Sequence, residues 1–326
     1  MPKKPDARPP LASPGPARPA HLATVTRGRE PDTLHYGMAC LVRDDGNILW
    51  SAGDPHSRAF LRSSAKPFQA LPLLASGAAD ALGLDDRDLA VICGSHPGGP
   101  EALAQVRGIL AKAGVEEGQL QCGDGVTDMC SGKHAGMLAT CRHAGWPLEN
   151  YLDPDHPLQR RILSTLADAC LMESHELPLA LDGCSAPTHA LPLYRMALGF
   201  ARLARQSNDG ADAPLSAAGR LFRSMLAHPG SLTGEPDLRG FPASGGLLVT
   251  KGGAGGLLCA ALPASGLGFA LKIADGSPVP RWPVFIGALE RAGILGEQEA
   301  GAMRQALWPP LLTRRGEPAG EIVLAF

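Results

Sequence analysis

Segments that favour β-strands lie near both ends of this chain, whereas its middle favours helices. Near the start, two apolar runs at 38–43 and 48–52 flank the sequence DDGN, a pattern typical of a β-hairpin. After about residue 243 the strand pattern returns as GGLLVT, GLLCAALP and LGFALKI, and the chain ends on EIVLAF. The sequence therefore predicts a mixed α/β chain of the α+β class, in which one antiparallel sheet is closed by both chain ends and a helical lobe lies between them.

Apolar side chains at helical spacing predict the helices of that lobe. The expected helices cover residues 62–77, 101–113, 155–172, about 191–206 and about 215–227. The apolar run at 89–93 fits either a short buried strand or a helix. Two shorter helices are expected at about 282–292 and 296–307, and the polar stretch 207–214 is expected to be an exposed insertion.

Proline separates a predicted tail from the folded body. Eight of the 30 prolines fall within residues 1–31, which predicts a disordered, Pro-rich tail there. Residues 32–326 then form the body, with a sheet lobe at about 32–60 and 243–326 and a helical lobe at about 61–242. The prolines also interrupt any signal-peptide pattern, and no apolar run reaches the roughly 18 residues of a membrane span. We therefore expect a cytoplasmic protein with no membrane partner.

Charge and cysteine content exclude several classes of protein. The 30 Lys and Arg residues nearly balance 32 Asp and Glu, so no nucleic-acid partner is expected. Eight cysteines in 326 residues are too few for a disulfide scaffold. Zinc-finger and thioredoxin-like motifs are excluded because the sequence contains no Cys-x-x-Cys. We expect free thiols, most of them small buried side chains.

The segment Arg62-Ser63-Ser64-Ala65-Lys66 is the first candidate for chemistry. If a helix begins near Ser63, then Ser63 and Lys66 share one face at i and i+3. A lysine whose pKa is lowered by burial or by a second cation can take the proton of a serine hydroxyl and make it a nucleophile. The alternative is an N-cap serine beside an exposed lysine. The loop Gly94-Ser95-His96 supplies another serine, which is uninformative alone.

Two cysteine motifs are the next candidates. Cys130-Ser131-Gly132-Lys133-His134 places a thiol near an imidazole, which suits a zinc site or a nucleophile–base pair. Asp182-Gly183-Cys184 places a carboxylate two residues from a thiol, which suits half of a metal site or of a polar substrate site. The alternatives are a structural turn with a buried thiol and a turn capped by the aspartate.

A glycine-rich segment, Thr250-Lys251-Gly252-Gly253-Ala254-Gly255-Gly256, follows a predicted strand. Glycines beside a lysine let a ligand approach the backbone closely. The segment is neither a Walker A loop nor a dinucleotide fingerprint, because Lys251 precedes the glycines and the G-x-G-x-x-G spacing is missing. The alternative is an ordinary glycine-rich hairpin.

Taken in order, the motifs RSSAKP, GSH, CSGKHAGM, DGCSAPTHALPL and KGGA with ALKIADGS resemble the bacterial L-asparaginase II family of the rhizobial thermolabile type, over about residues 35–326. The resemblance implies a fold similar to serine β-lactamases and penicillin-binding proteins. It also implies an amidohydrolase that converts L-asparagine and water to L-aspartate and ammonia, and a homodimer.

The same resemblance implies the members of a site. The implied catalytic serine–lysine pairs are Ser63 with Lys66 and Ser95 with Lys251. The implied zinc ligands are Cys130, Lys133 and Cys184. The implied substrate-binding residues are Asp182, which would grip the α-amino group, together with Arg62 and His134. We expect Lys66 to deprotonate Ser63, which attacks the side-chain amide to form an acyl-enzyme, while Ser95 and Lys251 relay protons.

The chain departs from the family pattern at three places. Gly255 stands where an acidic residue is usual, Pro97-Gly98-Gly99 replaces Ser-Gly-Glu, and Thr127-Asp128-Met129 replaces asparagine-like residues. These differences bear on substrate preference and efficiency more than on the fold. Two alternative functions stay open from the sequence: another β-lactamase-like serine amidohydrolase, and a non-catalytic zinc-binding or thiol-binding protein.

Overall fold

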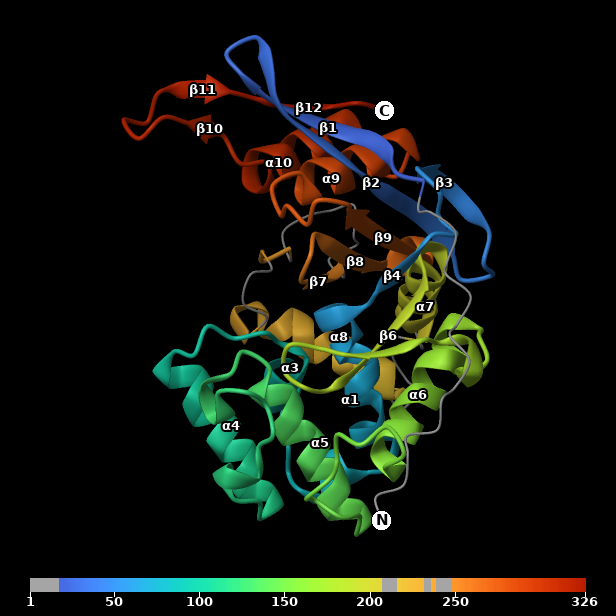
Figure 1. Ribbon diagram of the computed structural model, residues 1–326, viewed down its shortest axis with the longest axis vertical. Coiled ribbons are helices and arrows are strands. Elements are labelled where there is room, and N and C mark those ends of the chain that lie inside the picture. The colour runs from blue at the N-terminus through green and yellow to red at the C-terminus, as the bar shows by residue number, and fades with distance from the viewer. Residues whose placement is uncertain (1–17, 207–215, 232–235, 239–247) are drawn as a thin grey trace, which may run out of the picture.

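The computed structural model describes residues 18–206, 216–231, 236–238 and 248–326. Figure 1 shows an upper lobe built from both ends of the chain, in blue and in orange to red, above a helical lobe in green and yellow. The upper lobe holds an antiparallel sheet with the order β12-β1-β2-β9-β8-β7, in which β3 also pairs with β2. Its strands are β1 (Ala20–Arg27), β2 (Glu30–Arg43), β3 (Ile48–Ala52), β7 (Val249–Gly253), β8 (Leu257–Leu262), β9 (Leu267–Ile273) and β12 (Ile322–Leu324). The predicted α+β class and a sheet closed by both chain ends are confirmed.

Each face of the sheet packs against different helices. Side chains that alternate along a strand point to opposite faces. Phe269 and Leu271 of β9 therefore join one apolar cluster with α9 (Arg281–Arg291) and α10 (Glu297–Leu307). Ala270, between them, belongs to the second cluster, with α7 (Leu193–Gln206) and the helical lobe. The sheet thus separates two cores.

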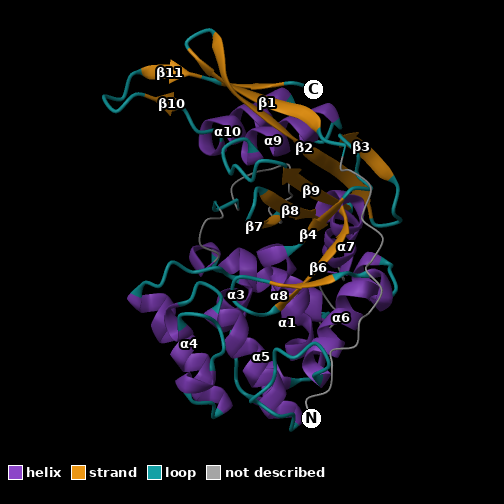
Figure 2. Cartoon of the chain, in the orientation of Figure 1, coloured by secondary structure: helices purple, strands orange, loops and turns teal. Residues whose placement is uncertain are grey.

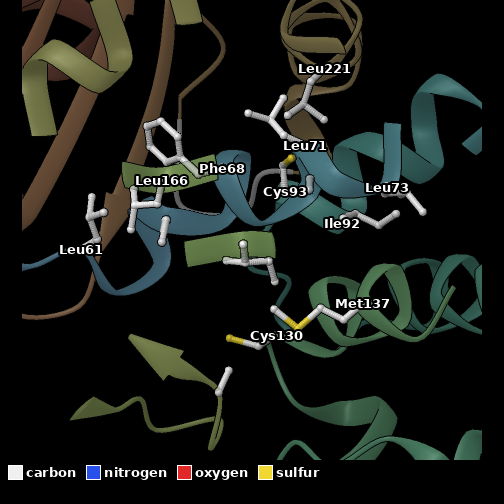
Figure 3. Packing of buried hydrophobic residues seen from close by; sticks show 14 of the residues in the cluster. Leu61, Phe68, Leu71, Leu73, Ile92, Cys93, Cys130, Met137, Leu166 and Leu221 are labelled. Atoms are coloured by element: carbon white, nitrogen blue, oxygen red, sulfur yellow. The ribbon is translucent and has the colours of Figure 1, made fainter. Parts of the chain in front are cut away.

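The helical lobe surrounds α1 (Lys66–Ala75) and α5 (Ser131–Ala144). Its other helices are α2 (Ala78–Ala81), α3 (Asp86–Cys93), α4 (Pro100–Ala113), α6 (Pro157–Cys170) and α8 (Ala217–Ala227). Figure 2 shows that helices dominate this lobe, with the short strands β4 (Arg58–Phe60), β5 (Leu179–Leu181) and β6 (Pro187–Pro192) at its edge. Figure 3 shows part of its core, in which Phe68 and Leu71 of α1 are buried, with Cys130 at the start of α5.

All seven predicted helices are confirmed, each to within a few residues at its ends, and the run 89–93 is the last part of α3. The expected insertion at 207–214 lies outside the described residues. Short strands were missed, namely β1, β4, β5, β6 and the hairpin of β10 (Leu311–Leu312) with β11 (Pro318–Gly320). In the described part of the chain, no helix is both long and apolar enough to cross a membrane.

The predicted boundary of the tail at residue 31 is wrong. Ala20–Arg27 form β1, which pairs with β2 on one side and β12 on the other. Leu22 is fully buried against α9 and the sheet, so this segment belongs to the folded body. The expectation of a tail is thereby limited to residues before β1, of which 1–17 lie outside the described part.

Gly268 of β9 is predicted to tolerate no side chain. A Cβ there would lie 1.9 Å from the Ala197 carbonyl oxygen, because the backbone of α7 presses directly on the strand. Gly268→Ala should lower the free energy of unfolding by about 1–3 kcal/mol, as overpacked cores do. Gly301→Ala is the matched control, since nothing lies within 4 Å of that position on α10. Urea denaturation of both variants measures the difference, and equal stability would contradict the close approach of α7.

Candidate functional site

The Lys66 ammonium joins the first candidate motif to the Gly94-Ser95 loop. Lys66 is the first residue of α1, and its Nζ donates hydrogen bonds to the Gly94 carbonyl and, at 2.9 Å, to Ser95 Oγ. The α3 helix ends at Cys93, so both acceptors belong to the two residues that directly follow it. Two segments 28 residues apart are thereby held together at one buried cation.

The environment of Lys66 favours its neutral form. Only 1% of the residue is exposed. Burial lowers the pKa of Lys66 to about 8, repulsion from Lys251 and Lys133 acts in the same direction, and Cys130 opposes it. Because the ordinary pKa of a lysine is about 10.4, a much larger fraction of this amine can accept a proton near neutral pH. Lys66 therefore has the property that a general base needs.

The two predicted serines occupy different surroundings. Ser95 contacts Lys66 directly, as described above. Ser63 lies in the 3₁₀ turn η1 (Arg62–Ala65), half-buried, and within the described residues its hydroxyl makes no hydrogen bond. The buried Ser64 donates to the Lys251 carbonyl at 2.7 Å and so ties η1 to β7. The resting structure therefore shows Lys66 bonded to Ser95 rather than to Ser63.

Lys251 lies on β7, and its carbonyl accepts the hydrogen bond from Ser64 of η1. Only 2% of it is exposed, and its Nζ donates to the Gly252 carbonyl at 3.1 Å. Its charge acts on Lys66, as the lowered pKa of Lys66 shows. Ser95 is bonded to Lys66 in this structure, and the predicted pairing of Ser95 with Lys251 stays a prediction.

Cys130, Lys133 and Cys184 come together from the start of α5 and the loop before β6. Lys133 Nζ donates to Cys184 Sγ at 2.9 Å. The Cys130 thiol donates a hydrogen bond to Cys184, and this bond is the largest cause that lowers the pKa of Cys184. His134 and Lys133 act in the same direction, while burial opposes them. The same bond raises the pKa of Cys130. Cys184 is therefore the thiolate of the pair. Burial opposes the charge of Lys133, but the two cysteines outweigh it and raise the pKa of that lysine.

The donor chemistry of this trio fits the predicted zinc ion. The two thiolate sulfurs are soft donors that suit zinc, and a deprotonated lysine nitrogen would be a third donor, which leaves a fourth position for water. Lys133 must lose its proton before it can bind a metal. In the ranges that the structure describes, no group of three or more His, Cys, Asp or Glu side chains could hold a metal ion, so the trio is complete only through its lysine.

Arg62 and Asp182 form an ion pair at the rim of the site. Arg62 Nε donates to Asp182 Oδ1 at 2.6 Å, and the Gly183 amide donates to the same oxygen at 2.8 Å. Arg62 has a φ of +48° and Ser185 one of +66°, a left-handed conformation that costs a non-glycine residue about 1–3 kcal/mol. Strained residues of this kind are frequent at functional sites. Here they lie in the two segments that the bond between Arg62 and Asp182 joins.

His134 lies deeper than a substrate-binding role suggests. It is fully buried, and its Nδ1 is 2.8 Å from the Tyr151 hydroxyl. Burial lowers the pKa of His134. Its Nε2 lies close enough to Cys184 to influence the pKa of both groups, yet makes no hydrogen bond of ordinary geometry in the described part. The structure therefore places His134 with the thiolate.

The sequence missed the anchoring role of His96. The Gly98 amide donates to His96 Nδ1 at 3.2 Å, so Nε2 carries the proton and donates to Ser131 Oγ at 2.7 Å. Ser131 Oγ in turn donates to the Val126 carbonyl at 2.8 Å. This chain of bonds fixes the residue next to Ser95 onto the start of α5. Only the position of the histidine beside Ser95 could have pointed to it.

Of the predicted site residues, Ser95 and Cys130 contact the buried Lys66, and Cys184 contacts Cys130 and Lys133. A family model described as L-asparaginase II matches residues 23–324. This chain belongs to the L-asparaginase II family. Membership implies an L-asparaginase, a hydrolase of the side-chain amide, and confirms the resemblance seen in the motifs.

Solved structures similar to this L-asparaginase II family member are distant. A β-lactamase from Mycobacterium bovis is 15% identical over 78% of this chain and 94% of its own, with a TM-score of 0.45. Mglu in its native form is 14% identical over 79% of this chain and 64% of its own, with a TM-score of 0.44. A putative β-lactamase from Bacteroides dorei is 11% identical over 78% and 93%, with a TM-score of 0.41. No curated protein matches this chain.

The N-cap of α3 should contribute pH-dependent stability to the helix that carries the Ser95 loop. Asp85 Oδ1 accepts from the Asp88 amide at 2.9 Å, and this bond is the main cause that lowers the pKa of Asp85. The stabilisation is therefore present above the ordinary pKa of 3.8 and is lost as the pH falls through the lower, folded-state value.

Asp85→Ala should cost about 1 kcal/mol near neutral pH. The difference from the wild type should shrink in acid, where the wild-type carboxylate is itself protonated. Asp85→Asn is the matched control, because an asparagine still caps the helix. Thermal unfolding across a pH series measures both, and a pH-independent loss in Asp85→Ala would contradict the charged cap.

Proposed function

We propose that this chain hydrolyses L-asparagine with Lys66 as the group that accepts and returns the proton. The observation that carries the proposal is the buried Lys66 amine, bonded to Ser95 and pressed by the charges of two further lysines. A serine hydroxyl needs a base within reach to attack an amide, and a lysine with a lowered pKa supplies one.

In the proposed first step, Ser63 Oγ bonds to the side-chain amide carbon and its proton passes to Lys66. The C–N bond then breaks, and Lys66 returns the proton to the leaving ammonia. Water hydrolyses the acyl-enzyme to release L-aspartate. Ser95 and Lys251 relay protons to and from Lys66, and the contact between Ser95 and Lys66 supports that part of the route. Catalytic hydrogen bonds often tighten only when substrate binds, so the unpaired Ser63 is compatible with attack.

Asp182 is proposed to grip the α-ammonium group of the substrate. Arg62 and the Gly183 amide occupy its Oδ1, while Oδ2 accepts no hydrogen bond in the described residues. The carboxylate is mostly buried, so a charge-assisted bond to an ammonium would be strong there. His134 is proposed to act behind the substrate, by keeping Cys184 and the start of α5 in place.

Zinc is proposed to bind Cys130, Lys133 and Cys184. When bound, it would polarise an oxygen or a water molecule as a Lewis acid. The contact between Lys133 and Cys184 brings the nitrogen and the sulfur together, and zinc would replace the proton that Lys133 now donates to the thiolate. A homodimer, a cytoplasmic location and the absence of nucleic-acid and membrane partners belong to the same proposal.

Replacing the nucleophile tests the mechanism. Ser63→Ala should lower kcat for L-asparagine by roughly 10⁴-fold or more, because the attacking atom is lost. Ser95→Ala should lose less, since water can replace a relay. Ser265→Ala, at the far turn between β8 and β9, is the matched control. Ammonia release measures all three. If Ser63→Ala keeps more than about a tenth of the activity, Ser63 is not the nucleophile and Ser95 takes that role.

Removal of zinc tests the metal separately. The purified protein is treated with a chelator, its zinc content is measured, and ammonia release is assayed before and after zinc is restored. A catalytic metal predicts a loss that zinc reverses. Turnover that is unchanged after complete removal would exclude a catalytic metal and leave zinc, at most, as a brace for the loop that carries Asp182.

A further inference from the structure

Lys272 lies on the same face of the sheet as Lys251, but no motif of the mechanism uses it. Lys251 is in register with Cys259 and Ala270, and two residues along the strands Gly253 is in register with Leu257 and Lys272. Ala270 faces the helical lobe. Because side chains alternate across a strand, Lys272 also faces that lobe and its site.

The ammonium of Lys272 keeps bonding capacity to spare. It donates to the Gly255 carbonyl and, at 3.0 Å, to the Ile273 carbonyl, while a lysine has three N–H donors. Within the described ranges no carboxylate forms an ion pair with it. Asp275 influences its charge, but both oxygens of Asp275 are engaged, by His35 at 2.7 Å and by the Ser277 amide at 2.8 Å.

Arg62 is a second cation whose charge acts on Lys272. The Gly253–Leu257 hairpin packs on η1, since a Cβ at Gly253 would lie 3.2 Å from both the Leu61 carbonyl and Ser64 Oγ. The Arg62 charge reaches Lys272 and helps to lower its pKa, after burial. Arg62 binds Asp182 through Nε, its two terminal nitrogens make no hydrogen bond with the residues that the structure describes, and 36% of its side chain is exposed. Arg62 and Lys272 are thus two cations at the border of the site, and Arg62 also binds the carboxylate of Asp182.

We propose that Lys272 and Arg62 form a binding corner for the α-carboxylate of the substrate, which makes Lys272 a specificity-determining residue. The inference rests on the proposed hydrolysis of L-asparagine. An anion between the two cations relieves their repulsion and takes the spare donors of both. The corner favours free amino acids over asparagine whose carboxyl group is amidated or joined in a peptide.

Gly255 keeps this corner cationic. It forms the hairpin turn with a φ of +74°, and a Cβ there would lie 3.3 Å from Lys272 Nζ. A carboxylate at this position would therefore neutralise the ammonium. With glycine, the hydrogen bonds of the ammonium among the described residues go to backbone carbonyls, and no carboxylate there pairs with it directly.

Two substrates test the corner, L-asparagine and L-asparaginamide, which lacks the α-carboxylate. Lys272→Met should lower the ratio of kcat/KM for L-asparagine to that for L-asparaginamide by about tenfold, mainly through KM. Lys272→Arg should restore most of the ratio, because a guanidinium also binds carboxylates. A structural role would lower both substrates equally, and an unchanged or equally lowered pair overturns the proposal.

Gly255→Asp and Gly255→Asn provide a second, matched test. Both residues tolerate a left-handed backbone and differ only in charge, so strain cancels between them. The aspartate variant should show the lower ratio, by several-fold. Equal ratios in the two variants would also overturn the proposal.

Binding separates this inference from the proposed function. If the wild type releases ammonia from neither substrate, the proposed function fails, and calorimetry with L-aspartate and its α-amide, isoasparagine, tests the corner instead. Wild-type preference for L-aspartate that is lost in Lys272→Met supports the corner. No binding of L-aspartate, or a preference unchanged by the substitution, overturns it.

Discussion

The burial of Lys66 is the constraint on which the rest of the site depends. A cation taken out of water needs compensating partners, and here the Gly94 carbonyl, Ser95 Oγ and the neighbouring Cys130 provide them. These partners come from three separate segments, so the lysine can be buried only when α1, the end of α3 and the start of α5 are all in place. Gly94 is required at this junction, because a Cβ there would lie 2.1 Å from the Ser231 carbonyl oxygen.

Charge balance then explains why a thiolate lies so close to a lysine cluster. Three lysines, Lys66, Lys133 and Lys251, are almost fully buried in one region. Burial, helped by repulsion from Lys251 and Lys133, lowers the pKa of Lys66 and favours its neutral form. The hydrogen bond from Cys130, followed by His134 and the charge of Lys133, lowers the pKa of Cys184 and favours its thiolate. The region therefore combines an amine that favours its neutral form, Lys66, with a thiol that favours its anionic form, Cys184. A metal ion bound by the thiolate would take the place of the Lys133 proton, because the lysine must be neutral to bind a metal.

Sequence reasoning predicted the residues of this site, and it could not predict the contacts that the structure shows between them. Periodicity gave the helices well, because α6 and α7 each bury one apolar stripe and repeat it over 14 residues. The short strands β5 and β6 have three and six residues, too few for alternation to stand out. β1 was missed because prolines precede it and one of its two pairing partners, β12, lies about 300 residues away at the end of the chain. The bond between Lys66 and Ser95 and the anchor of His96 on Ser131 are tertiary contacts, which no local spacing contains.

The strained backbone of Arg62 links the catalytic and recognition halves of the site. A left-handed arginine is maintained only when surrounding contacts determine it. Its side chain is bound by Asp182, Ser64 ties the same turn to β7, and Lys66 anchors the helix that follows. Because one residue separates Arg62 from Ser64, the turn cannot relax without moving both the serine motif and the cationic corner. In the proposed mechanism, substrate recognition and the position of the nucleophile are therefore both set by this one turn, and a change in either one reaches the other.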